Sequence, residues 1–360
     1  MSTAINIFIT LILIPWPAAL MMSPMMIAAA DFRNSRSSLL SATLILSYPV
    51  IVFAVLKFID FPFWGMDVKV WLFGVSVVSG IIVLLYGIPG MLINLGRGIK
   101  NDGYFKNDFY VFYDGNKISV TDPASFSVIT DDKFYAKDIK HVFYMGKIVK
   151  EADPMTFEPI KGIGEDLLEK HATIYWKDKA NVYYNAKKIE GCDVGTFQQI
   201  KSIYGKDRDH VYYGNTILPK ANPEKFRFLE EGIAIDEASI FIFNKRVNIP
   251  VDLPSFEVVK NGDYLFCKDK NYVYLLLYEN PEPLVKVDDA DVATFTLLER
   301  YYAKDKNQVY FYGYSKLNSR ALYHLTGADP DRFSVEYDAS TNSEATDGLN
   351  YYMSGKPVKV

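Results

Sequence analysis

The sequence has little of what a catalytic site or a disulfide framework needs. It holds two cysteines and four histidines among 360 residues. Cys192 and Cys267 occupy different positions of the repeats described below, which does not indicate a disulfide framework. The sequence contains no Cys-x-x-Cys, His-Glu-x-x-His, phosphate-binding glycine loop or nucleophile elbow. We therefore expect no enzymatic activity, no cofactor and no metal site.

Three long segments lack charged side chains altogether: residues 1–30, 37–56 and 70–96. Apolar runs of about 18 residues or more can cross a membrane as helices. We predict a membrane domain over residues 1–100, with three transmembrane helices at about 5–29, 38–57 and 70–94.

The first of these segments has alternatives. A signal peptide ending at Ala28-Ala29-Ala30 is one, although the segment lacks a basic start and is long for a signal. Pro15, Pro17 and Pro24 also leave a broken or re-entrant helix open.

Beyond residue 100 the chain has no excess of positive charge. The first hundred residues hold six of the 39 Lys and Arg and three of the 43 Asp and Glu. The remainder of the chain therefore has 33 basic and 40 acidic residues, a net charge of −7. This balance argues against nucleic-acid binding, which needs a basic surface. The repeats described next fill this part, leaving no room for a separate enzyme domain of ordinary size.

Residues 101–360 consist of two alternating phrases. The first is a Lys-Asp pair, followed at fixed distance by Val and two mostly aromatic residues. Its copies begin at Lys137, Lys177, Lys206, Lys268 and Lys304, with an altered first copy at Lys106-Asn107. The second phrase resembles Ala-Asp-Pro-x-x-Phe and begins at residues 121, 152, 192, 221, 251, 290 and 328.

Two further copies of the first phrase are irregular. The copy around Asp236 is degenerate and is interpreted as having lost its Lys-Asp, and residues 345–360 resemble a last hairpin. The array then has seven to eight hairpin repeats joined by seven connectors.

This alternation resembles the DKNYY family of bacterial repeat proteins, over about residues 103–360. The resemblance implies a repeat architecture. It carries over no catalytic residue and no established activity.

The fold class we predict is N-terminal transmembrane α-helices followed by an all-β repeat domain. Short β-branched and aromatic runs bounded by Asp, Asn, Gly and Lys are typical of strands joined by tight turns. The connector Asp or Asn suits a turn or cap, and its Phe can return to the core. A unit of about 30 residues must stack on its neighbours to bury a core. One connector fewer than hairpins favours an open, solenoid-like array, and a β-propeller is the alternative.

The recurring aspartates are interpreted as structural turn residues: Asp138, Asp178, Asp207, Asp269 and Asp305. Calcium-binding repeats need several oxygen ligands per loop, whereas each loop here repeats one Asp beside a Lys. His141 and His210 share a position that other copies fill with Tyr, Asn or Gln, which indicates a turn or edge site rather than a catalytic base.

The second residue of the aromatic pair forms a column of candidate contacts, either surface or core: Tyr113, Tyr144, Tyr184 and Tyr213. Neighbouring strand residues point to opposite faces, so we expect one member of each pair to be buried and the other more exposed.

Two functions remain. One is a membrane-anchored binding or scaffold protein that presents the Tyr-rich array to a protein, peptide or glycan partner. The other is a membrane sensor or transport accessory whose repeats regulate the helices, although the spans lack the ionisable residues typical of ion pathways.

Basic residues flank the predicted spans unequally. Four lie on one side and two on the other: Arg33, Arg36, Arg97 and Lys100 against Lys57 and Lys69. The positive-inside rule then places a multi-pass protein in a bacterial inner membrane with its repeats in the cytoplasm. A periplasmic or surface-exposed array stays open, because the family resemblance favours the outside.

Overall fold

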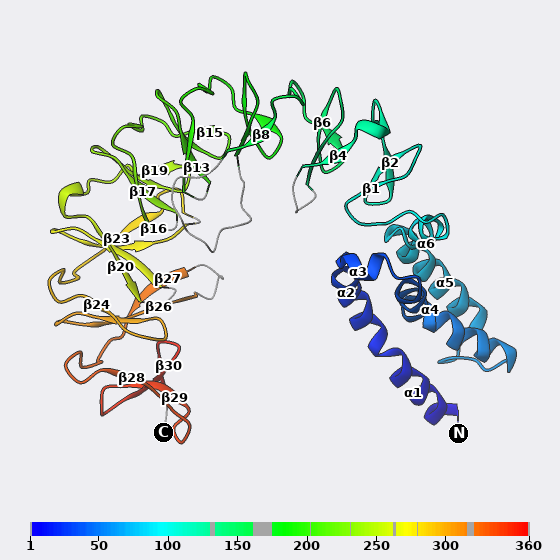
Figure 1. Ribbon diagram of the computed structural model, residues 1–360. Coiled ribbons are helices and arrows are strands. Elements are labelled where there is room, and N and C mark those ends of the chain that lie inside the picture. The colour runs from blue at the N-terminus through cyan, green and yellow to red at the C-terminus, as the bar shows by residue number, and fades with distance from the viewer. Residues whose placement is uncertain are drawn as a thin grey trace. The chain divides into compact units, whose positions relative to one another are not determined.

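The computed structural model describes residues 2–129, 134–160, 175–201, 203–230, 232–261, 264–278, 280–314 and 320–358. In these ranges, helices are followed by short antiparallel sheets (Figure 1). None of the described sheets closes on itself or pairs with another, so the predicted class, apolar helices followed by an open β-repeat array, is confirmed. The chain forms two compact units, one with the helices and the first two repeats, the other with most of the third repeat and all later ones.

The described helices all lie in the first hundred residues: α1 (Ser2–Leu13), α2 (Pro15–Ala28), α3 (Ala30–Arg33), α4 (Arg36–Phe58), α5 (Val68–Leu85) and α6 (Ile88–Gly96). Three segments are long and apolar enough to span a membrane: Thr3–Ala28, Arg36–Phe58 and Val68–Leu85. Their large apolar side chains lie largely on the outside, with Met25 82% and Phe58 94% exposed. Such exposure suits contact with lipid.

Two of these segments differ in detail from the predicted helices. The first is divided into α1 and α2, which meet at Pro15, because proline has no N–H for a helical hydrogen bond. The third stops at Leu85 instead of continuing to about residue 94. Gly87 has a φ of +67°, and α6 begins after it with Pro89 in its first turn.

A buried polar network joins the helices to the first sheet. Asn101 is 2% exposed, and its N–H donates to Asn34 Oδ1 at 2.7 Å. Its Nδ2 donates to the Arg33 carbonyl at 3.0 Å, and its Oδ1 accepts from Asn94 Nδ2 at 2.9 Å. Arg33 Nη2 also lies 2.9 Å from Asp102 Oδ1. A fully paired buried amide of this kind fixes the geometry of the junction.

Each repeat is one sheet whose strands are hydrogen-bonded in sequence order, and the strands are named A to D. The first repeat has only B to D: β1 (Tyr104–Lys106), β2 (Val111–Tyr113) and β3 (Asn116–Ile118). The next three have all four: β4 (Ser127–Val128), β5 (Tyr135–Lys137), β6 (Val142–Tyr144), β7 (Lys147–Ile148); β8 (Glu158–Pro159), β9 (Tyr175–Lys177), β10 (Val182–Tyr184), β11 (Lys187–Lys188); β12 (Gln198–Lys201), β13 (Tyr204–Lys206), β14 (Val211–Tyr213), β15 (Thr216–Ile217).

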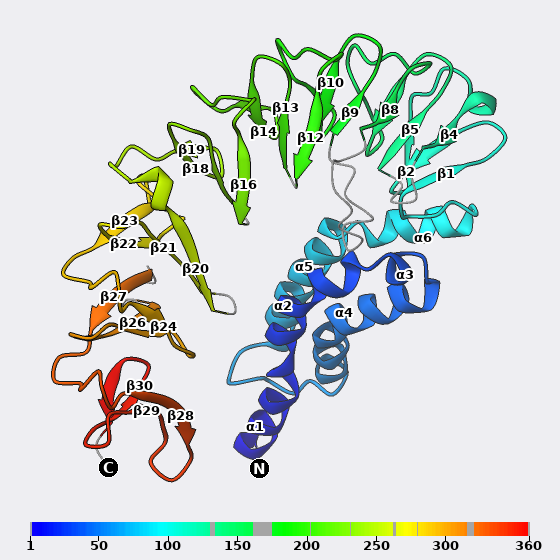
Figure 2. The same ribbon diagram turned by 60° about the vertical axis from the view of Figure 1, so that its left-hand side comes forward.

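Repeats 5 to 8 have the same order: β16 (Arg227–Glu230), β17 (Ile233–Ile235), β18 (Ile240–Ile242), β19 (Lys245–Arg246); β20 (Glu257–Asn261), β21 (Tyr264–Lys268), β22 (Val273–Leu276), β23 (Leu284–Val287); β24 (Thr296–Leu297), β25 (Tyr302–Lys304), β26 (Val309–Tyr314), β27 (Arg320–His324); β28 (Ser334–Asp338), β29 (Ser343–Thr346), β30 (Tyr351–Met353), β31 (Lys356–Val358). The strand after each connector is therefore strand A of the next sheet (Figure 2).

Sheets pack face to face, and both faces of an inner sheet are buried. In repeat 4, Tyr204 pairs with Tyr213 and lies on one face, while Tyr212 lies on the other. The Tyr204 face packs against Phe241 of repeat 5, with the connector residue Phe226 in the same cluster. All seven connector phenylalanines are buried, as predicted: Phe126, Phe157, Phe197, Phe226, Phe256, Phe295 and Phe333.

Candidate functional site

The predicted turn aspartates lie in the tight turn between strands B and C. All five are 2–4% exposed: Asp138, Asp178, Asp207, Asp269 and Asp305. In repeat 4, Asp207 Oδ1 accepts hydrogen bonds from the N–H groups of Asp209 and His210, at 2.9 and 2.7 Å. The corresponding pair of bonds recurs at Asp138, Asp269 and Asp305. One carboxylate oxygen thus holds the turn closed.

The other carboxylate oxygen binds a distant part of the chain. Asp207 Oδ2 accepts from the N–H of Asp193, in the preceding connector, at 2.9 Å, and from the Tyr212 hydroxyl at 2.7 Å. A connector N–H bonds in the same way to the other four aspartates, at 2.7–2.9 Å. Tyr274 and Tyr310 repeat the hydroxyl bond. We name this arrangement the aspartate clip.

The clip has two members that the sequence pattern did not assign. Asp236 Oδ2 accepts from the Asn222 N–H at 3.0 Å, and Asp347 accepts from the Asp329 N–H and the Tyr352 hydroxyl, both at 3.2 Å. The interpretation that the copy around Asp236 has lost its Lys-Asp is therefore wrong, because only the Lys is absent. The fixed spacing of four residues from Asp to the following Val, Ile or Tyr could have found both.

In three of the Lys-Asp pairs the lysine reaches forward to the next connector. Lys206 Nζ donates to the Pro223 carbonyl at 2.8 Å, and Lys137 Nζ to the Pro154 carbonyl at 2.9 Å. Lys304 bonds to the Pro330 carbonyl in the same way. Within one Lys-Asp pair, Asp therefore holds the preceding connector and Lys the following one. The fifth repeat has Ile235 at the lysine position, 2% exposed.

Four clip carboxylates are held in the charged form by hydrogen bonds. Burial alone would raise the pKa of Asp207, but the three N–H donors and the Tyr212 hydroxyl outweigh it and lower the pKa below its usual value. The same balance lowers the pKa of Asp138 and Asp269, and that of Asp347 to about 2. Across the described ranges no three His, Cys, Asp or Glu side chains gather in a group that could hold a metal ion.

The described histidines lie in three different repeats, and the two cysteines lie in a connector and in strand β21. His141 lies in the clip turn, its Nδ1 3.2 Å from Thr121 Oγ1, and His324 Nδ1 lies 2.7 Å from Gln308 Oε1. His171 lies outside the described residues. Burial raises the pKa of the Cys192 and Cys267 thiols to about 12, so neither is a thiolate near neutral pH.

The candidate tyrosine column is half-buried, and we name it the tyrosine ladder: Tyr113, Tyr144, Tyr184 and Tyr213. The first members of the same pairs are buried: Phe112, Phe143, Tyr183 and Tyr212. Each ladder ring contacts the tyrosine opposite it on strand B, as in Tyr204–Tyr213, with ring centroids 5.1 Å apart. The two pair members do lie on opposite faces, but stacking on both faces leaves the ladder rings only partly exposed.

Ladder rings also support the next repeat. Gly214 has a φ of +60°, and a Cβ there would lie 3.0 Å from the Tyr184 ring. A Cβ on Gly146, which has a φ of +76°, would lie 2.7 Å from Tyr113 Cβ. Both turns need glycine, because their backbone rests on the preceding ladder residue in a left-handed conformation.

The two ends of each repeat differ in how far their lengths vary. We name the end with the B–C turns and connectors the clip end, and the end with the A–B and C–D turns the ladder end. The spacing from Lys to Val across the B–C turn is five residues in every regular copy. At the ladder end, the spacing from the connector Phe to the next Lys ranges from 9 residues (Phe197 to Lys206) to 20 (Phe157 to Lys177).

Strands C and D show the same contrast. From Val211 to Leu218 the chain takes 7 residues, but from Val273 to Val287 it takes 14. The additional residues again fall at the ladder end, between strands C and D.

A family model covers nearly all of this array. The DKNYY model matches residues 89–179 and 175–356. The chain belongs to the DKNYY family. The match starts within α6 and ends at residue 356, so it spans the described repeats up to the start of β31 and leaves out the candidate membrane spans. No curated protein and no solved structure matches the chain.

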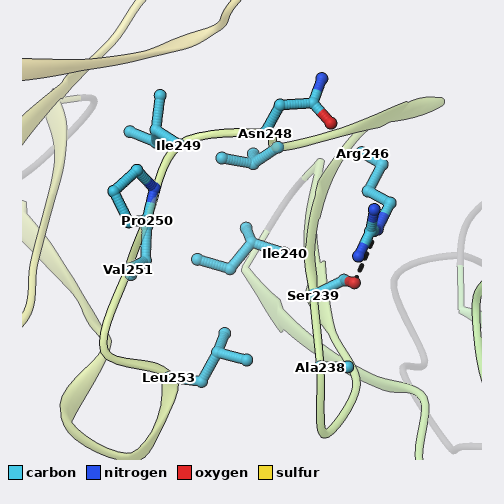
Figure 3. Close-up of a pocket in the computed structure, with 10 residues that line it drawn as sticks. Ala238, Ser239, Ile240, Arg246, Asn248, Ile249, Pro250, Val251 and Leu253 are labelled. Carbon is cyan, nitrogen blue, oxygen red and sulfur yellow. Dashed lines mark hydrogen bonds between the residues drawn. The ribbon is translucent and has the colours of Figure 1, made fainter.

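One DKNYY repeat, the fifth, carries a surface pocket of about 360 Å³ (Figure 3). Five of its ten lining residues are Ile240, Ile249, Pro250, Val251 and Leu253, and their side chains surround the hollow in the close-up. Its polar lining residues are Asn248 and a bonded pair, in which Arg246 Nε donates to Ser239 Oγ at 2.7 Å. The volume is in the range of small-molecule sites.

Proposed function

We propose that this DKNYY protein is a membrane-anchored binding or scaffold protein that contacts a protein, peptide or glycan through the ladder end of its repeats. One observation carries this proposal. Nearly all the length differences between repeats fall at the ladder end, while the clip end keeps its spacing except for one added residue in the fifth repeat. In repeat proteins, insertions that gather on one face often mark the binding face.

The chemistry of the ladder end supports the same proposal. Its half-buried tyrosine rings are large and already ordered by packing, so they lose little conformational entropy on binding. At the clip end, by contrast, the recurring Asp and Lys side chains are already bonded within the array. Binding, rather than catalysis, is therefore the function that these residues favour.

Photo-crosslinking in the native membrane tests this proposal. A benzoylphenylalanine at Tyr184 probes the ladder end, and the same residue at Glu224, an exposed connector position, probes the clip end. We expect a discrete adduct from Tyr184 and none from Glu224. Adducts from Glu224 alone would contradict the proposal.

Substitutions then separate a distributed surface from a local site. With the crosslinker at residue 184, Tyr144→Ala and Tyr213→Ala should each weaken the adduct modestly and by similar amounts. A single substitution elsewhere that abolished function while leaving stability intact would instead indicate a localised site.

The membrane topology that we propose has the repeats in the cytoplasm of a bacterium, from the four basic residues around the helix ends against two on the other side. A reporter active only in the periplasm should be silent when fused after Val360 and active when fused after Asp60. The reverse pattern would place the array outside and favour an envelope role.

A sensor or transport accessory is the second candidate. The observation that favours it is the paired network of Asn101, Arg33 and Asp102, which connects the first repeat to the helix ends. If Arg33→Gln altered the phenotype without altering adduct formation at Tyr184, coupling to the helices would become the better account.

A further inference from the structure

The fifth repeat departs from the array at the pocket. In repeats 1 and 6, the residue before the Val of strand C faces a lysine on strand D. Tyr110 lies under the Lys117 ammonium, 3.5 Å from nitrogen to ring centroid, and Tyr272 lies under Lys286 at 3.6 Å. The fifth repeat places Ser239 opposite Arg246. A small hydroxyl thus replaces a ring beside a cation.

The loop behind this pair is also different. From the strand-D apolar residue to the connector Asp or Asn, the chain takes four residues in the neighbouring repeat (Leu218 to Asn222) but five in this one (Val247 to Asp252). Lys220 turns the chain with a φ of +61°, whereas none of the residues from 248 to 251 has a positive φ. Ile249 and Pro250 occupy the longer loop and line the hollow.

The cation at this hollow has bonding capacity left. Arg246 uses Nε for Ser239, and no described residue is recorded as a partner of its two Nη groups. Asn248 is held instead by Glu282, whose Oε1 accepts from its Nδ2 at 3.1 Å. A guanidinium fixed at one nitrogen presents its remaining N–H donors in a geometry that suits a carboxylate.

We propose that this pocket binds a small carboxylate that carries an apolar chain, with the carboxylate on the Nη groups of Arg246 and the chain against Ile249, Pro250 and Leu253. Either a peptide C-terminus with an apolar last residue or a fatty acid has this chemistry. The site belongs to the clip end of one repeat, so it goes beyond the binding role proposed for the ladder end.

Calorimetric titration of the full chain in lipid nanodiscs, with empty nanodiscs as the blank, tests the site. N-acetyl-leucine represents the peptide source and octanoate the fatty-acid source, and N-acetyl-leucinamide and octanol are their uncharged counterparts. We expect saturable binding of at least one acid and a loss of about tenfold or more in affinity for its uncharged counterpart. The acid that binds identifies the source.

Three variants make the result specific to the pocket. Arg246→Gln should weaken the acid about tenfold or more. Ser239→Tyr should abolish binding, because the ring would fill the hollow and lie beside the cation as in repeats 1 and 6. Arg227→Gln, which removes an exposed arginine of the same repeat, should leave the affinity unchanged.

Several outcomes would overturn the site. They are no saturable binding of either acid, equal binding of the uncharged counterparts, or wild-type affinity in the Arg246 and Ser239 variants. If a variant fails to fold, as judged by its melting profile, the site is tested on the wild-type chain by comparing the affinity of each acid with that of its uncharged counterpart. Failure here leaves crosslinking at Tyr184 unaffected, so the two proposals can fail separately.

Discussion

The clip end and the ladder end of each repeat are formed by the same strands but differ in their bonding and in how far their turns vary in length. At the clip end, a buried carboxylate joins a turn, a connector and an aromatic hydroxyl, and the spacing of the turn does not change. At the ladder end, tyrosines pack against the next repeat, yet the turns between them differ in length from copy to copy. The constant residues and spacing of the clip end are thus those that stacking requires. The variable turns of the ladder end are the places where one repeat can differ from another without disrupting the array.

Acid should have the largest effect on the stability of the clip end, because it acts on several clips together. The pKa of Asp138, Asp207 and Asp269 is lowered, and that of Asp347 reaches about 2, since hydrogen-bond donors outweigh the effect of burial. A lowered pKa stabilises the fold above the unfolded value of about 4, and that contribution is lost as the pH falls toward about 2.

Thermal melting of the full chain in nanodiscs measures this effect. The melting temperature should change little between about pH 7 and 5 and fall steeply between about pH 4 and 2. A melting temperature that stays constant down to this acid limit would show that the clips contribute little.

Removal of one clip should have the next largest effect. Asp207→Ala leaves three N–H groups and the Tyr212 hydroxyl without their acceptor, so we expect a loss of at least about 3 kcal/mol in the free energy of unfolding. Asp209→Ala is the matched control. Among the described residues its exposed carboxylate pairs with Arg208 alone, so the loss should stay below about 0.5 kcal/mol. Chemical denaturation of both variants checks the pair, and equal losses would contradict the clip.

Neighbouring tyrosines offer a finer comparison of the two faces. Tyr212→Phe removes a buried hydroxyl that donates to Asp207 at 2.7 Å and should cost about 1–2 kcal/mol. Tyr213→Phe removes a ladder hydroxyl for which no hydrogen bond is recorded among the described residues, so its cost should be near zero. The same denaturation experiment compares them, and a greater cost at Tyr213 would reverse the assignment.

Loss of the hydrogen bond from the lysine to the following connector should have the smallest effect on the free energy of unfolding. Lys206→Ile removes the bond to the Pro223 carbonyl but copies the arrangement at Ile235, so we expect a loss of about 1 kcal/mol or less. Its denaturation midpoint should lie between those of the wild type and Asp207→Ala. A loss as large as that of Asp207→Ala would mean that Lys and Asp contribute equally.

Local patterns predicted the elements well, because strand alternation and turn chemistry act over a few residues. The turn role of Asp207, the buried connector Phe226 and the apolar helices are all of this kind. The bond between Asp207 and Asp193 was not predictable in the same way, since it joins residues 14 apart through a connector whose path depends on stacking. The turn role of Asp236 was not predicted, because Ile235 replaces the Lys of the Lys-Asp pair. The spacing of four residues from Asp236 to Ile240 is nevertheless the same as in the other copies.

Tertiary stacking also explains the ladder. Alternation predicts opposite faces for Tyr183 and Tyr184, but it does not say what covers each face. Because an inner sheet has a neighbour on both sides, Tyr184 is half-buried rather than freely exposed. The pocket of the fifth repeat was missed for a similar reason. Its signals, Ser239 in place of a ring and one added residue before Asp252, become meaningful only when strand D is seen opposite the turn.

Hydrogen–deuterium exchange on the full chain tests the aspartate clip most directly. The N–H groups of Asp193 and His210 lie outside strands, yet both donate to the buried Asp207 carboxylate. We predict that these two N–H groups exchange as slowly as the amides of β13 and β14. In the Asp207→Ala variant both should exchange rapidly, and no other amide should exchange more slowly than in the wild type. Exchange of both amides at the rate of an open turn in the wild type would contradict the clip as the tie between repeats.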